Sequence, residues 1–323
     1  MKKVLITGSS GLVGSACMDY FVARDWATLG IDADMRHEFF DTPSKDSEYY
    51  VDIRDYSGLL SLFERNKFDA IIHTAAQPSH DWSKDDPLTD FEVNAQGTLY
   101  LLELTRRHNP DAVFVHVSTD KVYGWGMRRA ALEETGDLWF SDRPFDEATL
   151  IEPPLSPFGV SKLCADMYAQ EYAAQGWVTT GIFRPGCITG QNHEGAEQHG
   201  FLAYLVKCIK EGKTYKIFGY DGKQVRDQIH ARDLAGAFYH FINNPRSGEV
   251  YNIGGGYERA LSPLSAGAIV AEKLGKPFKY EYVEEPRFGD RQWDVHDISK
   301  FREHYPDWDF EYSLDQLIDD VCS

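Results

Sequence analysis

Short, nearly continuous apolar runs alternate with longer amphipathic segments from about Lys3 to Trp177. Runs without polar positions, such as Ala70 to Ile72, are typical of strands that are buried on both faces of a parallel sheet. The segments between them carry the apolar spacing of helices. The pattern therefore predicts a parallel α/β sheet covered by helices. The predicted strands are 4–7, 27–31, 70–73, 112–118 and 178–183, and the predicted helices are 12–24, 91–108 and 161–175.

The alternation ends after about Gly186, where loops containing glycine and histidine begin. Helix-like segments then return, and we expect them to form a smaller α/β lobe. Residues 1–186 are predicted to be the first domain and residues 187–323 mainly the second lobe, with room for segments that return to the first domain. The stretch 124–154 is the predicted irregular insertion. The helix-like segments are 201–211, 231–243 and 262–274.

Composition narrows the class of protein. The 323 residues are 42% hydrophobic and 14% aromatic, which suits an ordinary soluble globule with a substantial core. A net charge of −18 disfavours binding to nucleic acid. No run reaches ~18 apolar residues and no export signal precedes Val4, so we expect no membrane span. The five cysteines lack a C-x-x-C spacing, which favours a reducing cytoplasm over a disulfide framework.

Three glycines separate the first strand from the first helix. Gly8, Gly11 and Gly14 allow a tight turn, let the backbone approach a pyrophosphate, and point amide groups at it from a helix N-terminus. The pattern alone is weak, but its position between a strand and a helix is the one that dinucleotide binding requires. Leu12 and Val13, between the glycines, are expected to contact the same ligand. The fold predicted is thus a doubly wound parallel sheet of the Rossmann type.

Asp32 ends the second strand, 18 positions after Gly14. A carboxylate there accepts hydrogen bonds from both hydroxyls of an adenine ribose and repels a 2′-phosphate, so NAD is favoured over NADP. Arg36 complicates this choice, because a guanidinium could meet a phosphate or be a solvated surface charge. Asp52 can either meet the adenine or be a turn residue. The other residues predicted to contact the cofactor here are Asp34, Met35, Ile53, Thr74, Ala75, Ala76 and Gln77.

Two further segments carry candidate chemistry. Residues 118–124 read Ser-Thr-Asp-Lys-Val-Tyr-Gly after the fifth strand, and residues 158–162 read Phe-Gly-Val-Ser-Lys at the start of a helix. With the glycine loop, they make the chain resemble the extended short-chain dehydrogenase/reductases, that is, NAD-dependent epimerases and dehydratases, over nearly its whole length. The resemblance implies that Thr119 holds the substrate alcohol and Lys162 the nicotinamide ribose. It also implies cofactor contacts from Asn94, Ser118 and Pro185.

Phe158 departs from the family, which has a catalytic tyrosine at this position. A phenylalanine can neither ionise nor donate a hydrogen bond, and general acid/base catalysis commonly contributes ~10²–10⁴-fold in rate. We expect the fold and pocket to be intact and turnover to be impaired. Three explanations stand: an engineered replacement of tyrosine, a natural protein that only binds, or an enzyme with another base. Tyr123, His80 and Asp120 are the conceivable substitutes.

The residues after Thr119 discriminate among reactions. The resemblance implies that dehydratases need Thr-Asp-Glu here, whereas this chain has Thr119-Asp120-Lys121, so dehydration is disfavoured. The Thr-x-Lys-Val-Tyr-Gly pattern is similar to that of CDP-tyvelose (CDP-paratose) 2-epimerases, as are the segments 222–227 and 190–201. No metal site is expected, because His193 and His199 have no recognised zinc spacing. The residues expected to bind substrate are His80, Thr119, Asp120, Lys121, Cys187, Gly200, Phe201, Arg226 and Arg287.

The function expected from this resemblance is NAD-dependent epimerisation of a nucleotide sugar. A CDP-dideoxyhexose that reacts at carbon 2 through a keto intermediate is favoured. The alternatives are a UDP-hexose 4-epimerase, another nucleotide-sugar oxidoreductase, or a sensor that binds NAD or a nucleotide sugar without turnover. The resemblance also implies a homodimer built on the helices at 91–108 and 161–175.

Overall fold

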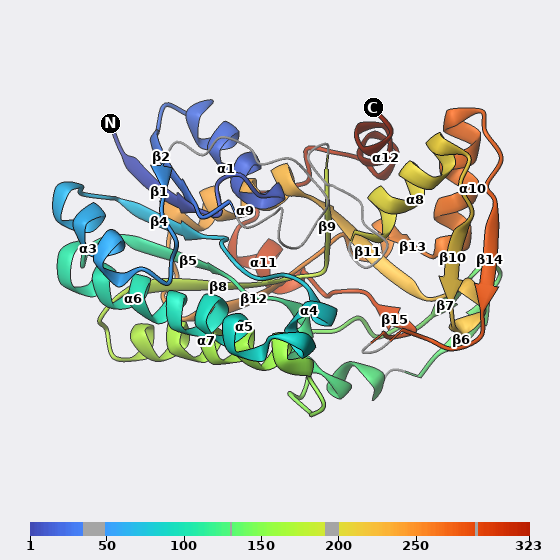
Figure 1. Ribbon diagram of the computed structural model, residues 1–323, viewed down its shortest axis with the longest axis horizontal. Coiled ribbons are helices and arrows are strands. Elements are labelled where there is room, and N and C mark those ends of the chain that lie inside the picture. The colour runs from blue at the N-terminus through green and yellow to red at the C-terminus, as the bar shows by residue number, and fades with distance from the viewer. Residues whose placement is uncertain (35–48, 130, 191–199, 288–289) are drawn as a thin grey trace.

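The structure is a computed structural model that describes residues 1–34, 49–129, 131–190, 200–287 and 290–323. Within these residues, the main sheet has seven strands in the order β12-β8-β5-β4-β1-β2-β3, and every neighbouring pair is parallel (Figure 1). The α/β prediction is confirmed. The strands are β1 (Lys3–Thr7), β2 (Ala27–Asp32), β3 (Tyr49–Tyr50), β4 (Ala70–His73), β5 (Val113–Val117), β8 (Thr179–Pro185) and β12 (Glu249–Ile253).

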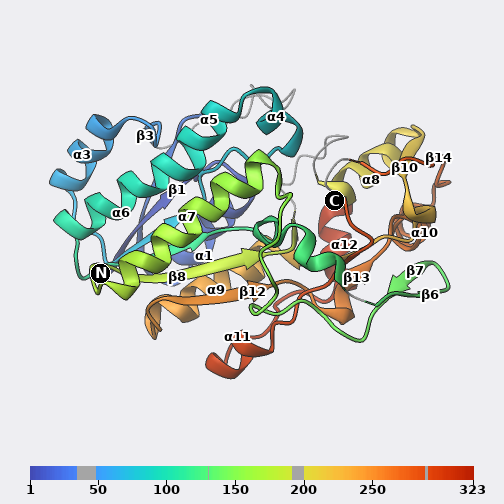
Figure 2. The same cartoon turned by 90° about the horizontal axis from the view of Figure 1, so that it is seen from below.

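Helices cover both faces of this sheet, and each face has its own core. Successive strand residues point to opposite faces, so Val4 and Ile6 pack in one cluster while Leu5 packs in the other. Helices α1 and α9 pack together on the first face, and α3, α6 and α7 lie on the second (Figure 2). Their bounds are α1 (Leu12–Val22), α3 (Tyr56–Arg65), α6 (Gly97–His108), α7 (Ser156–Ala174) and α9 (Ala231–Asn243).

Two of the predicted helices differ from the structure at their first turns. Helix α7 begins five residues before the predicted start, because Pro157 is compatible with the first helical turn, where no amide hydrogen is needed. The structure divides the region of the helix predicted at 91–108 into three consecutive helical segments. Helix α5 (Pro87–Phe91) leads into a π-helical turn (Glu92–Gln96) and then into α6.

A smaller lobe has its own hydrophobic cluster, built by helices around a two-stranded parallel sheet. Strand β11 bridges the lobe and the main domain, because it pairs with β9, β13 and β15. Two segments of the second half return to the main domain: β12 pairs with β8, and α9 packs on α1. The bounds are α8 (Phe201–Glu211), α10 (Pro263–Leu274), α12 (Leu314–Cys322), β9 (Cys187–Thr189), β10 (Tyr215–Phe218), β11 (Val225–His230), β13 (Ala260–Leu261), β14 (Tyr280–Val283) and β15 (Trp293–Asp294).

The stretch predicted as irregular connects the two lobes. Its hairpin of β6 (Glu133–Thr135) and β7 (Leu138–Phe140) donates a backbone hydrogen bond from Trp139 to Lys223. Further along, the amide of Phe145 donates to Val295. No helix among the described residues is long and apolar enough to cross a membrane. The remaining short helices are α4 (His80–Asp85) and α11 (Ser299–His304), with 3₁₀ turns at Asp120–Tyr123, Trp125–Arg129, Tyr220–Gly222 and Tyr257–Arg259.

Candidate active site

A cavity of about 500 Å³ lies at the carboxyl ends of β1, β4 and β5 and extends to β9 and the start of α8. This is the edge at which open parallel sheets bind ligands. Most of the residues predicted for the site line it. They are Gly8, Gly11, Leu12, Val13, Gly14, Asp32, Asp52, Ile53, Thr74, Ala75, Ala76, Gln77, His80, Ser118, Thr119, Asp120, Lys121, Phe158, Lys162, Pro185, Cys187, Gly200, Phe201 and Arg287.

Three predicted residues that the structure describes are not part of this lining, and two others lie outside the described residues. Asp34, Asn94 and Arg226 are described but do not face the cavity, whereas Met35 and Arg36 lie outside the described residues. Sequence reasoning in turn missed several apolar lining positions and one polar residue, Gln228, because no motif distinguishes them from ordinary core. The missed lining residues are Ile31, Ala33, Val51, Pro78, Val93, Val117, Gly186, Ile188, Leu202 and Gln228.

The glycine loop is closed so tightly that side chains are excluded from it. Gly8 has a left-handed φ of +68°, and a Cβ there would lie 2.7 Å from the amide nitrogen of Ala75. A Cβ on Gly14 would lie 2.0 Å from the carbonyl oxygen of Gly8. The loop thus brings bare backbone and the N-terminus of α1 to the cavity, which is the arrangement that a pyrophosphate requires.

Asp32 stands at the adenosine end. One carboxylate oxygen accepts from the amide of Ser10 and the other from the amide of Asp34, both at 2.9 Å. Each oxygen keeps a lone pair for a ribose hydroxyl. Asp52 differs, because its carboxylate forms an ion pair with Arg54, with Oδ2 and Nη2 2.6 Å apart. Burial opposes ionisation of Asp52, but the hydrogen bonds from Arg54 outweigh it and lower the pKa of this carboxyl.

Asn94 acts from behind the cavity wall. The π-helical turn brings its amide group to Gln77, where it accepts from the backbone amide at 2.9 Å. The same side chain donates to Ser161 Oγ at 3.1 Å. The structure therefore places Asn94 as a buried link between the strand β4 loop and α7, where it fixes the position of both.

Lys162 enters the cavity from α7 through a buried environment. Its Nζ donates to the carbonyl oxygen of Val117 at 2.6 Å. Burial disfavours the ammonium ion and lowers the pKa of Lys162 to about 8, although Asp166 and Asp90 favour the charge. Beside it, Ser118 Oγ donates to Asp166 at 2.6 Å. Lys162 therefore lies where it can donate to a ribose hydroxyl.

Phe158 occupies the wall of the cavity next to His80. The two rings meet edge to face, with their centroids 4.9 Å apart. His80 Nδ1 lies 3.0 Å from Ser156 Oγ, and Ser156 holds a left-handed φ of +70°, which non-glycine residues rarely adopt. Sequence reasoning missed Ser156, since a serine before proline carries no signal of this contact.

The other two conceivable substitutes for tyrosine are engaged elsewhere. Tyr123 is fully buried outside the cavity lining, where its hydroxyl donates to Asn252 at 2.7 Å and accepts from Arg184 at 3.0 Å. Burial raises the pKa of Tyr123 to about 12. Asp120 does line the cavity, but its Oδ2 is bonded to Lys121 at 2.9 Å and to Arg291.

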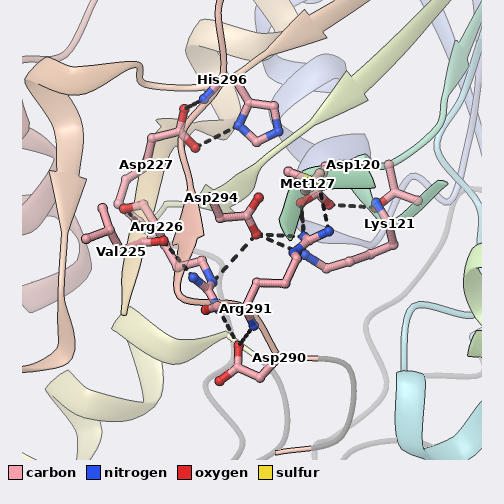
Figure 3. A network of polar contacts seen from close by, with 12 residues as sticks. Asp120, Lys121, Met127, Val225, Arg226, Asp227, Asp290, Arg291, Asp294 and His296 are labelled. Atoms are coloured by element: carbon pink, nitrogen blue, oxygen red, sulfur yellow. Dashed lines mark hydrogen bonds and ion pairs between the residues drawn. The ribbon is translucent and has the colours of Figure 1, made fainter. Parts of the chain in front are cut away.

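Asp120 and Lys121, which line the cavity, belong to a largely buried ion-pair network (Figure 3). Arg291 bonds both Asp120 and Asp294, the latter at 2.7 Å, and Lys121 lies 3.3 Å from Asp294. One atom each of Asp120, Asp294 and His296 lies within 4.8 Å of the other two, a spacing that a metal ion could bridge. Both carboxylates already face cations, however, so the arrangement works as an ion-pair network.

The two arginines expected to bind substrate have different surroundings. Arg226 is largely buried, bonds Asp290, and donates to the carbonyl oxygens of Val225 and Arg291 (Figure 3). Arg287 lines the cavity, with its guanidinium 4.5 Å from the centroid of the Phe218 ring. The structure thus leaves Arg287 available to an anion, whereas Arg226 holds the network together.

The remaining predicted residues line the end of the cavity at β9 and α8. Cys187 begins β9 in register with Gln228, and burial raises the pKa of its thiol to about 12, so it stays protonated and serves packing. Gly200 has a left-handed φ of +77° directly before α8, and Phe201 opens that helix. This end of the cavity is therefore formed by the smaller lobe.

Sequence comparison with known proteins gives a consistent result. The NAD dependent epimerase/dehydratase family matches residues 4–254. A CDP-paratose 2-epimerase of Salmonella typhi is 29% identical over 319 residues, covering 92% of each chain. A dTDP-glucose 4,6-dehydratase of Haemophilus influenzae is 30% identical over 338 residues, covering 98% of this chain and 90% of the relative.

Solved structures share the fold over almost the whole chain. The UDP-glucose 4-epimerase of Thermus thermophilus, a complex with NAD, superposes with a TM-score of 0.80 at 24% identity and covers 99% of this chain and 98% of its own. The dTDP-glucose 4,6-dehydratase of Bacillus anthracis, also with NAD, gives 0.79 at 25% identity, covering 100% and 96%. The Rossmann-type expectation is confirmed by both.

The cofactor expectation is confirmed as well. The matching family is NAD dependent, and the glycine loop and the Asp32 carboxylate fit that dinucleotide. NAD is therefore the cofactor of this protein. Since the family match spans more than half of the residues, the chain belongs to the NAD dependent epimerase/dehydratase family.

Proposed function

We propose that this protein is an NAD-dependent nucleotide-sugar epimerase that inverts carbon 2 of a CDP-dideoxyhexose. The observation that supports this most directly is one cavity in which the dinucleotide loop, Thr119, Lys162 and Lys121 come together. The CDP-paratose 2-epimerase of Salmonella typhi supports the substrate class. Lys121 argues against dehydration, because its ammonium group, bonded to Asp120 and Asp294, cannot take a glutamate's place as a base.

Each residue of the site has a separate role in this proposal. When bound, NAD would supply the hydride acceptor for oxidation of the sugar and, in its reduced form, the hydride donor for return to the opposite face. Lys162 holds the nicotinamide ribose, Asp32 the adenine ribose, and the glycine loop the pyrophosphate. Thr119 orients the reacting oxygen from the end of β5, and Arg287 meets the phosphates of the sugar nucleotide. The protein's contribution is positioning and electrostatics. Because Phe158 has no hydroxyl, turnover is slower than in a tyrosine form.

Two alternatives have specific support. UDP-hexose 4-epimerisation is supported by the fold shared with the Thermus thermophilus enzyme, although that likeness concerns architecture. A sensor that binds without turnover is supported by Phe158, which removes the usual acid/base while the cavity around it stays complete. The first alternative differs from the main proposal in the nucleotide that is preferred. The second differs in that a tyrosine hydroxyl at position 158 would not produce turnover.

Product analysis by NMR tests these possibilities. The chain with Phe158 and its Phe158→Tyr variant are incubated with NAD and, separately, with CDP-tyvelose, CDP-paratose and UDP-hexoses. Inversion at carbon 2 of a CDP sugar by either form supports the proposal, and we expect the tyrosine form to be faster. Inversion at carbon 4 of a UDP-hexose supports the first alternative. Binding of NAD without turnover by either form supports the sensor.

We further propose that the protein is a cytoplasmic homodimer. The described chain has five free cysteines, in keeping with a reducing compartment. Apolar side chains are exposed on the neighbouring helices α5 and α7: Leu88 is 76% exposed, Val160 53% and Met167 52%. A second copy of the chain would cover this surface.

A further inference from the structure

The site has a polar group next to Phe158 that the family machinery does not use. His80 opens helix α4 from the Ser79 cap and lines the cavity together with Thr119 and Lys162. Its ring packs edge to face on Phe158, with centroids 4.9 Å apart. An imidazole therefore lies beside the position from which a tyrosine hydroxyl would act.

The contacts of His80 leave one ring nitrogen unused. Nδ1 lies 3.0 Å from Ser156 Oγ, which also accepts from the amide of Gly159 at 3.2 Å. If Nδ1 carries the hydrogen, Ser156 fills its two lone pairs with these two donors, and Nε2 has a bare lone pair. Among the described residues, no hydrogen bond reaches Nε2.

Burial and the nearby cations keep the His80 ring neutral. Burial is the main cause and the nearby cations Lys121 and Arg291 add to it, so the pKa of His80 falls to about 3, although Asp120 and Asp81 oppose this. At neutral pH the ring is therefore unprotonated and has a lone pair for a proton, but with a pKa of about 3 it is a weak base. It is also a weaker base than a phenolate, which fits an impaired but not abolished turnover.

We propose that His80 is a catalytic residue that replaces the missing tyrosine hydroxyl: Nε2 takes the proton of the sugar hydroxyl and later returns it. This inference rests on the proposed epimerase function. In the first half-reaction the sugar O–H and C–H bonds break and a C=O bond forms, with the proton passing to Nε2 and the hydride to NAD. The second half-reaction reverses both transfers, with the hydride returning to the other face of the carbon.

The electrostatics of the cavity favour this pairing of transfers. The hydride cancels the positive charge of the oxidised nicotinamide at the time when the proton puts a charge on His80. The net charge of the cavity is therefore unchanged, and the cost of burying an imidazolium is partly offset. Ser156 keeps its contact with Nδ1 throughout, so it is a positioning residue for His80.

Four forms of the protein test the proposal: the unaltered chain, His80→Gln, Phe158→Tyr and the double variant. Glutamine can keep a hydrogen bond to Ser156 but cannot carry the proton. We expect His80→Gln to lower the single-turnover rate of NAD reduction by ~10²-fold or more. We expect the double variant to recover the rate of Phe158→Tyr, because the tyrosine hydroxyl makes His80 unnecessary. His240→Asn, on α9 and away from the cavity lining, is the matched control and should leave the rate unchanged.

Two measurements do not depend on turnover. Calorimetry with NAD and thermal unfolding should give nearly equal NAD affinities and melting temperatures for the unaltered chain and His80→Gln, which shows that the variant is folded. Imidazole ¹⁵N NMR of the unaltered chain should show a bare Nε2, with a signal that shifts when the CDP sugar binds. A bare Nδ1 with hydrogen on Nε2 in the free protein would overturn the assignment.

The outcomes separate this proposal from the proposed function. Full activity of His80→Gln, or epimer formation by Phe158→Tyr alone, would overturn the role of His80 and leave the epimerase function standing. If no form turns over any CDP or UDP sugar, the epimerase function fails and the role of His80 fails with it. Loss of activity in both His80→Gln and the double variant would show that His80 serves structure rather than proton transfer.

Discussion

The carboxylate of Asp227 holds His296 at two points. Its Oδ1 lies 2.9 Å from His296 Nδ1, and its Oδ2 accepts from the backbone amide of His296 at 3.1 Å. Both side chains are fully buried. Gly254 makes room for the pair, since a Cβ there would lie 2.3 Å from Asp227 Oδ2. The contact ties β11 to the segment after β15 (Figure 3).

This pair predicts a loss of stability at alkaline pH. Burial opposes the charge on His296, but Asp227 outweighs it and raises the pKa from 6.5 to about 9. A group with a raised folded-state pKa contributes stability that is complete below pH 6.5 and is lost as the pH rises through about 9. The shift corresponds to a contribution on the order of 3 kcal/mol. Urea unfolding between pH 6 and 10 measures it.

The control is the neutral double variant Asp227→Asn/His296→Asn, which cannot titrate at this pair. Lys162, whose pKa is lowered to about 8, shifts stability in the opposite direction above pH 8 in both proteins. The difference between the two proteins therefore isolates the pair. Equal pH dependence in both would show that His296 is not charged in the folded state.

Arg291 should be one of the most destabilising positions to truncate. Its guanidinium is buried against Asp120 and Asp294. Arg291→Met leaves these carboxylates with less compensating charge, and removal of one partner from a buried pair commonly costs ~3–5 kcal/mol. Chemical unfolding measures the loss. Arg302→Met breaks the exposed contact with Asp309 and should change the free energy of unfolding little, so comparable losses in the two variants would contradict the argument.

Asp32 should control the choice of dinucleotide. We expect Asp32→Asn to weaken NAD binding ~10- to 100-fold, because charge-assisted hydrogen bonds to two ribose hydroxyls are weakened. Discrimination against NADP should shrink, because the repulsion of a 2′-phosphate is removed. Calorimetry with both dinucleotides gives the ratio of affinities. Asp55→Asn, at the cap of α3 and outside the cavity lining, should leave that ratio unchanged.

The exposed apolar surface of α5 and α7 predicts the assembly. Met167→Glu places a charge on this surface, and burying an unpaired charge in an interface is costly. We expect the unaltered chain to sediment as a dimer and this variant as a monomer with unchanged NAD affinity. Leu150→Glu makes the same kind of change at an exposed position in the 124–154 insertion. It should not alter the mass of the assembly measured by sedimentation. Sedimentation of the unaltered chain as a monomer would refute the proposal.

The sequence carried local information well and long-range information poorly. Gly8, Gly14 and Asp32 could be identified because a turn, a helix start and a strand end follow each other within a few residues. The network around Arg291 and Asp294 was missed, because these residues lie about 170 positions from Asp120 and no local pattern marks them. Arg226 was expected to bind substrate. Only the fold shows that its guanidinium forms ion pairs with Asp290 and Asp294.

The sequence by itself determined the parallel α/β fold, the dinucleotide loop, the preference for NAD and the absence of a hydroxyl at Phe158. These follow from periodicity and from side-chain chemistry, both of which are local. Only the tertiary structure decided that α9 and β12 return to the main domain, that Tyr123 and Asp120 are engaged elsewhere, and that His80 lies beside Phe158. The physical reason is that packing sets these contacts between segments that are distant along the chain.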